Sequence, residues 1–115
     1  MGDIVRGRLR GAAEAPATGE TTEVLATAGA AVVEQILSGR LDAPVDYLGT
    51  ADEWVVVIAG GAELEVAGTP VALAPGDWLL LPAGTPHRLT ATRPGTSWIT
   101  VTAPVAPARP TGPGG

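Results

Sequence analysis

The residues of this sequence best suited to chemistry are one histidine and one isolated carboxylate. His87 is the only histidine, and it follows the stretch GDWLLLPAGTP, where an apolar run leads into a Pro- and Gly-rich turn. Glu53 opens the apolar run EWVVVI, in which burial of an unpaired carboxylate would cost free energy. An imidazole exchanges protons near neutral pH. His87 is therefore either a functional acid or base, or a residue beside the turn whose ring only makes hydrogen bonds with the backbone.

Composition excludes several classes of protein. The chain has 115 residues, enough for one domain, and a formal net charge of -5, which argues against a nucleic-acid partner. It contains no cysteine, so disulfides, thiolate nucleophiles and sulfur metal ligands are excluded. No apolar run is long enough to span a membrane, and the first residues lack the apolar segment of a signal peptide. We expect a cytoplasmic protein without a membrane partner.

The hydrophobic pattern predicts short strands separated by turns. We expect residues 1–19 to form an N-terminal strand or loop; if a strand forms, Arg6, Arg8 and Arg10 would share one side of it. A hydroxyl cap and the later Gly29 favour a short helix over residues 21–26. Strands are predicted at 31–38, 53–58, 62–66, 71–74, 77–81, 86–92 and 97–102. With connections this short, the strands should pair antiparallel in a small all-β barrel. Residues 104–115 are rich in Pro and Gly and are predicted to be a disordered tail.

Two groups of residues at fixed offsets resemble the sequence motifs of the cupin superfamily. The second motif is matched by Gly76, Pro82, Gly84 and His87, and the end of the first by Glu53 and Gly60. The resemblance covers about residues 20–103 and implies a double-stranded β-helix, that is, a jelly-roll barrel. It also implies that Glu53 takes the carboxylate position and His87 the last histidine position of the metal-binding members.

The first motif departs from the family pattern where a His-x-His pair is expected. Those positions hold either Tyr47 and Gly49 or Asp46 and Leu48, depending on the spacing. With two of four ligands missing, we expect no cofactor. The alternative is a divalent metal (Mn, Mg, Fe or Zn) held by Glu53, His87 and Asp46, an oxygen-rich set better suited to Mn or Mg than to Zn.

Strand alternation predicts which side chains reach the barrel interior. If Glu53 points inward, so does Val55, whereas Trp54 faces outward; His87 would bring Leu89 inward and send Arg88 out. The candidate catalytic residues are His87, Glu53 and Tyr47, and the candidate substrate contacts are Gln35, Trp54, Trp78, Val55 and Leu89. The tryptophans are also candidates for the core or a subunit interface.

A carboxylate beside an imidazole in an apolar cavity is typical of general acid–base catalysis. The leading hypothesis is an enzyme that acts on a small organic molecule inside the barrel, as an isomerase, cyclase or lyase of the dehydratase type. One alternative is a non-catalytic small-molecule-binding cupin, and another is a metal-dependent oxygenase with an atypical ligand set. A homodimer is also expected, because the run EWVVVI is apolar on both faces and needs cover.

Overall fold

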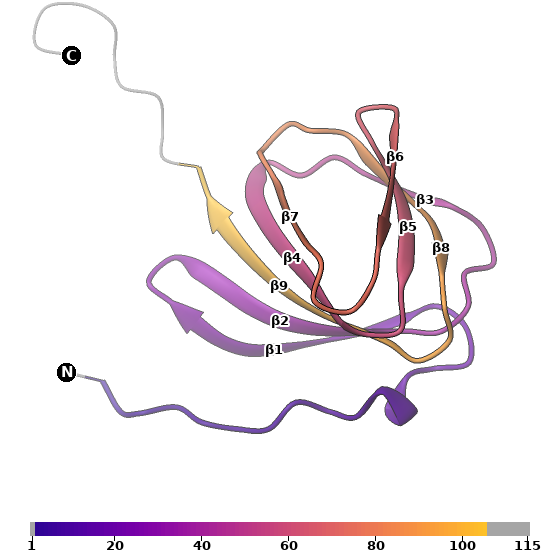
Figure 1. Cartoon of the computed structure of the whole chain (residues 1–115). Helices are drawn as coiled ribbons and strands as arrows, with labels where there is room; N and C mark the ends of the chain where they lie inside the picture. Colours follow the sequence, from indigo (N-terminus) through magenta and orange to yellow (C-terminus); the bar gives the residue numbers. More distant parts are fainter. Residues whose placement is uncertain (1, 106–115) are drawn as a thin grey trace, which may run out of the picture.

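The computed structural model describes residues 2–105, which form two antiparallel sheets that face each other (Figure 1). The five-stranded sheet has the order β1 (Glu20–Ala28), β2 (Ala31–Ser38), β9 (Thr96–Pro104), β4 (Ala51–Ala59), β7 (Trp78–Leu81). The four-stranded sheet has the order β3 (Val45–Tyr47), β8 (His87–Thr92), β5 (Ala62–Val66), β6 (Thr69–Leu73). This is the predicted all-β jelly-roll architecture. Within the described residues, no helix is long and apolar enough to cross a membrane.

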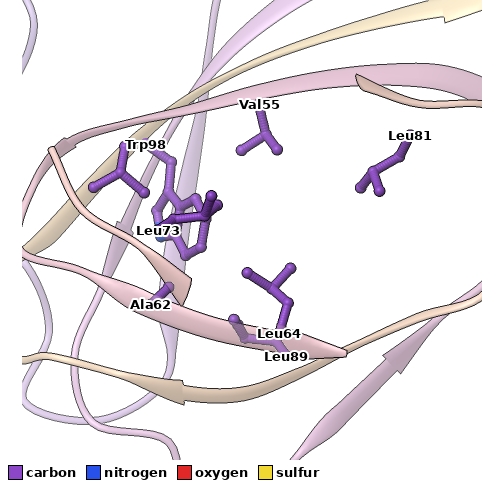
Figure 2. Close-up of a cluster of buried hydrophobic side chains, with 8 residues drawn as sticks. Val55, Ala62, Leu64, Leu73, Leu81, Leu89 and Trp98 are labelled. Carbon is purple, nitrogen blue, oxygen red and sulfur yellow. The ribbon is translucent and has the colours of Figure 1, made fainter. Parts of the chain in front are cut away.

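The core forms because alternate residues of both sheets point into the space between them. On β4, Val55 and Val57 are buried while Ile58 is exposed, as the alternation predicts. Apolar side chains of the two sheets meet in one cluster (Figure 2), whose labelled members are Val55, Ala62, Leu64, Leu73, Leu81, Leu89 and Trp98. The sequence contains no phenylalanine, and Trp98 is the one aromatic side chain in this cluster. The core is consequently built mainly from leucine and valine.

The predicted helix over residues 21–26 is wrong. These residues belong to β1, which pairs antiparallel with β2 from Glu20↔Ser38 to Ala28↔Ala31. The apparent helix stop, Gly29, is instead part of the hairpin turn, where it adopts a φ of +60°. Two adjacent threonines and a valine fit a pleated strand better than a helix, and pairing with β2 overrides the local cap signal. The only helical element described is a short 3-10 turn, η1 (Ala12–Glu14).

The N-terminal segment takes the loop alternative, and the last strand is longer than predicted. Residues 2–10 form no strand, and the arginines at 6 and 8 are exposed; Arg10 pairs with Glu23 at 2.6 Å. Strand β9 extends to Pro104, beyond the predicted end at residue 102. The disordered tail was predicted over residues 104–115; Pro104 belongs to β9 instead, and residues 106–115 lie outside the described part of the chain.

One hairpin carries a local strain that suggests a stabilising substitution. Ala67 and Gly68 connect β5 to β6 as a two-residue turn and have φ values of +48° and +84°. Two positive φ values indicate a type I′ turn, for which Asn-Gly is preferred over Ala-Gly. Ala67→Asn is expected to raise the free energy of unfolding by about 0.5–1 kcal/mol, measured by chemical denaturation. Ala67→Val should lower it, and equal effects of the two substitutions would contradict this account.

Candidate functional site

A cavity of about 260 Å³ lies between the two sheets and is lined from both of them. Its apolar wall is formed by Ile36, Val55, Leu64, Leu81, Leu89 and Trp98. Its polar groups are the carboxylates of Glu20, Glu34 and Glu53, the hydroxyls of Thr22, Thr100 and Thr102, and the rings of Tyr47 and His87. Apolar walls with a few convergent polar groups are the usual composition of a small-molecule site. The predicted pair of Glu53 and His87 therefore does share one cavity.

Glu53 reaches the cavity because it lies on the inward face of β4. Its neighbours across the sheet are Leu81 on β7 and Thr102 on β9. Burial among such neighbours raises the pKa of the Glu53 carboxyl, the positive charge available on His87 lowers it, and the Glu34 carboxylate raises it further. Burial is the largest of these effects. Glu53 is thus a more basic carboxylate than one in water.

His87 is placed by the turn that follows β7. Gly84 adopts a φ of +80°, and its N–H donates to the Gly49 carbonyl at 2.9 Å. With its proton on Nδ1, the His87 ring can donate to the Thr85 carbonyl at 3.3 Å, which leaves Nε2 as an acceptor. The ring also stacks on Tyr47, with centroids 5.2 Å apart and planes 12° apart. The turn and the stacking together restrict the orientation of the imidazole.

A third carboxylate, Glu20, was not predicted from the sequence. Its Oε2 accepts a 2.5 Å hydrogen bond from Ser38 Oγ, and its Oε1 accepts one from the Tyr47 hydroxyl at 3.2 Å. Ser38 Oγ in turn accepts the indole N–H of Trp98 at 2.9 Å. Burial and the nearby Glu20 carboxylate raise the pKa of Tyr47 to about 12, with a smaller contribution from Glu53. Tyr47 is therefore protonated at neutral pH and is engaged by Glu20.

A strand interpretation of residues 21–26 would have revealed this group. In a strand that includes both residues, Glu20 and Thr22 point to one face, whereas the predicted helix over residues 21–26 begins after Glu20 and leaves it unassigned. Pairing with β2 then sets Glu20 opposite Ser38, beside the cavity.

Three predicted substrate contacts lie outside the cavity. Gln35 is on the outward face of β2 and is only 2% exposed; its amide bonds to both backbone groups of Arg10 and donates to Ser97 Oγ. The hydrogen bonds between Gln35 and Arg10 thus hold the N-terminal segment against the five-stranded sheet. Trp54 and Trp78 lie together on the outward face of β4 and β7, with ring centroids 6.1 Å apart. Strand alternation, which turns Glu53 and Val55 inward, turns these residues outward. Val55 and Leu89 do line the cavity, as predicted.

The predicted metal ligands do not form a donor set. Asp46 is exposed and accepts a hydrogen bond from Arg88 Nε at 2.7 Å, which also lowers the pKa of its carboxyl. Among residues 2–105, no three His, Asp or Glu side chains are grouped so that they could hold a metal ion. The side chains present therefore do not fit the metal that the resemblance implies.

The comparisons with known proteins agree with this architecture. The cupin domain family model matches residues 32–101, more than half of the chain. The chain belongs to the cupin family. This cupin is 31% identical to a protein from Ralstonia eutropha JMP134 provisionally named mannose-6-phosphate isomerase; the match covers 86% of this chain and 100% of that one, with a TM-score of 0.73.

Two other solved structures share the cupin fold at lower identity. KdgF from Halomonas sp. is 22% identical over 76% of this chain and 82% of that one, with a TM-score of 0.64. A cupin superfamily protein from Desulfitobacterium hafniense DCB-2 is 18% identical over 82% of this chain and 87% of that one, with a TM-score of 0.69. No match is found among proteins of curated function.

Proposed function

We propose that this cupin is an enzyme that moves protons on a small organic molecule inside the barrel, in an isomerisation or dehydration. The observation that carries the proposal is a half-buried carboxylate with a raised pKa, Glu53, which shares an apolar-walled cavity with the only imidazole of the chain. Perturbed carboxylates beside an imidazole in a cavity are typical of acid–base sites. The similarity to a protein provisionally named as an isomerase supports the same reaction class.

In this proposal Glu53 is the general base. Burial makes its carboxylate a better proton acceptor than a solvated one, so it removes a proton from the substrate carbon. His87, held by the Thr85 carbonyl and the Tyr47 ring, returns a proton to the substrate at a second position. Tyr47 acts as a positioning residue, because its hydroxyl is already donated to Glu20 and its ring stacks on His87. For this step the His87 ring is doubly protonated, so that Nε2–H gives the proton while Nδ1–H stays on the Thr85 carbonyl. After the step Glu53 carries the proton taken from the substrate and His87 lacks one, and exchange with water restores both groups, so the proton count balances.

Deuterium exchange tests the proposal on many candidate substrates at once. The protein is incubated in D₂O with mixtures of small carbonyl, hydroxyl and amine compounds, and mass spectrometry detects any compound that gains deuterium only when protein is present. The wild type should label at least one compound, and His87→Gln should label it far more slowly. Labelling that is equally fast in His87→Gln would remove the imidazole from the mechanism.

The second candidate is a non-catalytic binding protein, favoured by the absence of two expected family histidines. In that case a ligand would bind in the cavity, protect the protein against heat and gain no deuterium. Such a result would overturn the enzyme proposal and retain the cavity as a binding site. A metal-dependent oxygenase is not favoured, because Asp46 is paired with Arg88 and does not line the cavity that Glu53 and His87 share.

A homodimer is proposed on the outward face of the five-stranded sheet. Trp78 and Leu80 on β7 are 59% and 57% exposed and pair with Val56 and Trp54 on β4. Exposed contiguous apolar surface of this kind marks an interface, and a two-fold axis would cover it with its own copy. Light scattering should give the mass of two chains for the wild type and of one for the double variant Trp78→Ser/Leu80→Ser. The control Leu48→Ser removes an exposed leucine outside this face; a wild-type monomer would contradict the proposal.

A further inference from the structure

The charges that line the cavity are almost all of one sign. Three carboxylates and the single imidazole line it, and no arginine is among the lining residues. Among the described arginines, Arg10 and Arg88 are paired outside the cavity with Glu23 and Asp46. The sequence contains no lysine. Proteins hold phosphate and carboxylate groups with arginine, lysine or clustered backbone N–H groups, so this lining opposes an anionic ligand.

Within residues 2–105, two of the carboxylates and the three threonine hydroxyls that line the cavity make no side-chain hydrogen bond. In the described part of the chain, the side chains of Glu34 and Glu53 make no hydrogen bond or ion pair, although both are partly buried. Thr100 is only 3% exposed and lines the cavity, and none of the side-chain hydrogen bonds within residues 2–105 involves its hydroxyl. Because no fully buried polar side-chain atom in this part of the chain lacks a partner, the Thr100 hydroxyl is open to the cavity. Glu20 differs, because Ser38 and Tyr47 each donate to one of its oxygens.

The register of strands β2, β9 and β4 places these carboxylates and hydroxyls next to one another. Glu34 on β2 is directly opposite Thr100 on β9, and Glu53 on β4 is directly opposite Thr102 on the same strand β9. Thr100 and Thr102 are two residues apart and so point to the same face. Two carboxylates and two hydroxyls therefore occupy neighbouring inward positions on three adjacent strands. All four groups can accept a hydrogen bond, and the carboxylates bear negative charge.

We infer that the cavity binds a small molecule with a protonated amine on a compact apolar body, and that the ammonium group lies among Glu34, Glu53 and Thr100. This inference rests on the proposed function only in taking the same cavity as the working site. An ammonium group has three N–H donors and no acceptor, which complements a set of acceptors. The leucines of the opposite sheet, Leu64 and Leu89, cover the apolar body. The mutual repulsion of Glu34 and Glu53 contributes to the raised pKa of Glu53, and a bound cation would relieve it.

Three probes of the same size and different charge test the inference. Cyclohexylammonium, cyclohexanol and cyclohexanecarboxylate are titrated into the full chain at pH 7 with EDTA present, and binding is followed by the NMR signals of the Trp98 indole N–H and the Thr100 amide. Cyclohexylammonium should bind about tenfold or more tightly than cyclohexanol, and the carboxylate more weakly than the alcohol. Added salt should reduce the difference. Equal binding of the three probes, or preference for the carboxylate, would overturn the inference.

Matched variants test which residues make the protein prefer cyclohexylammonium over cyclohexanol. Glu34→Gln should weaken cyclohexylammonium binding by about tenfold and leave cyclohexanol unchanged. Thr100→Val keeps the shape of its side chain and should weaken only the ammonium probe, which provides a second test if Glu34→Gln folds poorly. Glu63→Gln removes an exposed carboxylate outside the cavity and should change neither affinity. If Glu34→Gln and Thr100→Val each weakened the binding of both probes equally, these residues would shape the cavity but would not distinguish an ammonium group from a hydroxyl.

The failure of this inference is distinguishable from the failure of the proposed function. Deuterium exchange on a neutral compound, together with no preference for cyclohexylammonium, would overturn the charge assignment and keep the acid–base enzyme. Preference for cyclohexylammonium without exchange on any compound would keep the charge assignment and overturn the enzyme.

Discussion

Replacing Glu53 with glutamine is expected to slow protein-dependent deuterium exchange by about 10²- to 10⁴-fold, the usual contribution of a positioned general base. Glutamine has nearly the same shape as glutamate, so the cavity between the sheets should keep its volume. Glutamine cannot accept a proton at neutral pH, so the variant lacks the general base that we propose for the removal of a proton from the substrate carbon. Exchange is measured by mass spectrometry on whichever compound the wild type labels, at equal protein concentration.

The same substitution should stabilise the fold at neutral pH. Burial raises the pKa of Glu53, so the folded protein binds more protons than the unfolded chain between the ordinary carboxyl pKa and the raised one. The unfolding free energy therefore falls as pH rises through that interval. Glu53→Gln removes this loss, so its stability relative to the wild type should increase from pH 4 to pH 7 in chemical denaturation. A slower reaction in a more stable protein is the pattern expected of a functional carboxylate.

Glu63→Gln is the matched control for both measurements. Glu63 lies on the exposed face of β5, outside the cavity, so the exchange rate should be unaffected. The interpretation of Glu53 as the base would fail if Glu53→Gln exchanged at the wild-type rate.

Replacing Gly60 with alanine is expected to lower the unfolding free energy by about 2–5 kcal/mol, through backbone strain and steric overlap. Gly60 has a φ of +83°, in the left-handed region that disfavours a side chain. A Cβ there would meet the Thr96 hydroxyl and lie 2.7 Å from the Thr96 Cα. Thr96 is fully buried and cannot move easily, because its hydroxyl accepts the Gly61 N–H at 3.1 Å. The loss is measured by chemical denaturation.

Gly76→Ala separates the two causes of this loss. Gly76 has a similar φ of +91°, but a Cβ at that position meets nothing within 4 Å. Its alanine variant should therefore lose only the cost of backbone strain, about 1–2 kcal/mol. The difference between the two variants reports the overlap with Thr96. Equal losses would show that the packing of Gly60 against Thr96 contributes nothing.

The sequence predicted the inward side chains of β4 and β8 correctly. Val55 and Leu89 line the cavity together with Glu53 and His87, and Arg88 points to solvent, because side chains alternate strictly along a strand. The same rule should have excluded Trp54 from the candidate contacts, since it lies between two inward residues, Glu53 and Val55.

The partners of each side chain were not predictable from local pattern. Asp46 fitted the oxygen-rich metal set in sequence spacing, but its pairing with Arg88 depends on the register of β3 against β8. Gln35 had a polar side chain of suitable size, yet its amide is occupied by Arg10 and Ser97, which are distant in the chain.

The sequence by itself determined the cupin motifs, the absence of the family's histidine pair and the alternation that turns Glu53 and His87 inward. These features depend on residue type and on spacing within single strands. Only the tertiary structure decided that residues 21–26 form a strand, that Glu20 joins the cavity through Ser38 and Tyr47, and that Glu34 lies beside Thr100 without a protein partner among the described residues. Those contacts arise from the pairing of strands far apart in the chain, and strand register is set by how whole sheets bury their apolar faces.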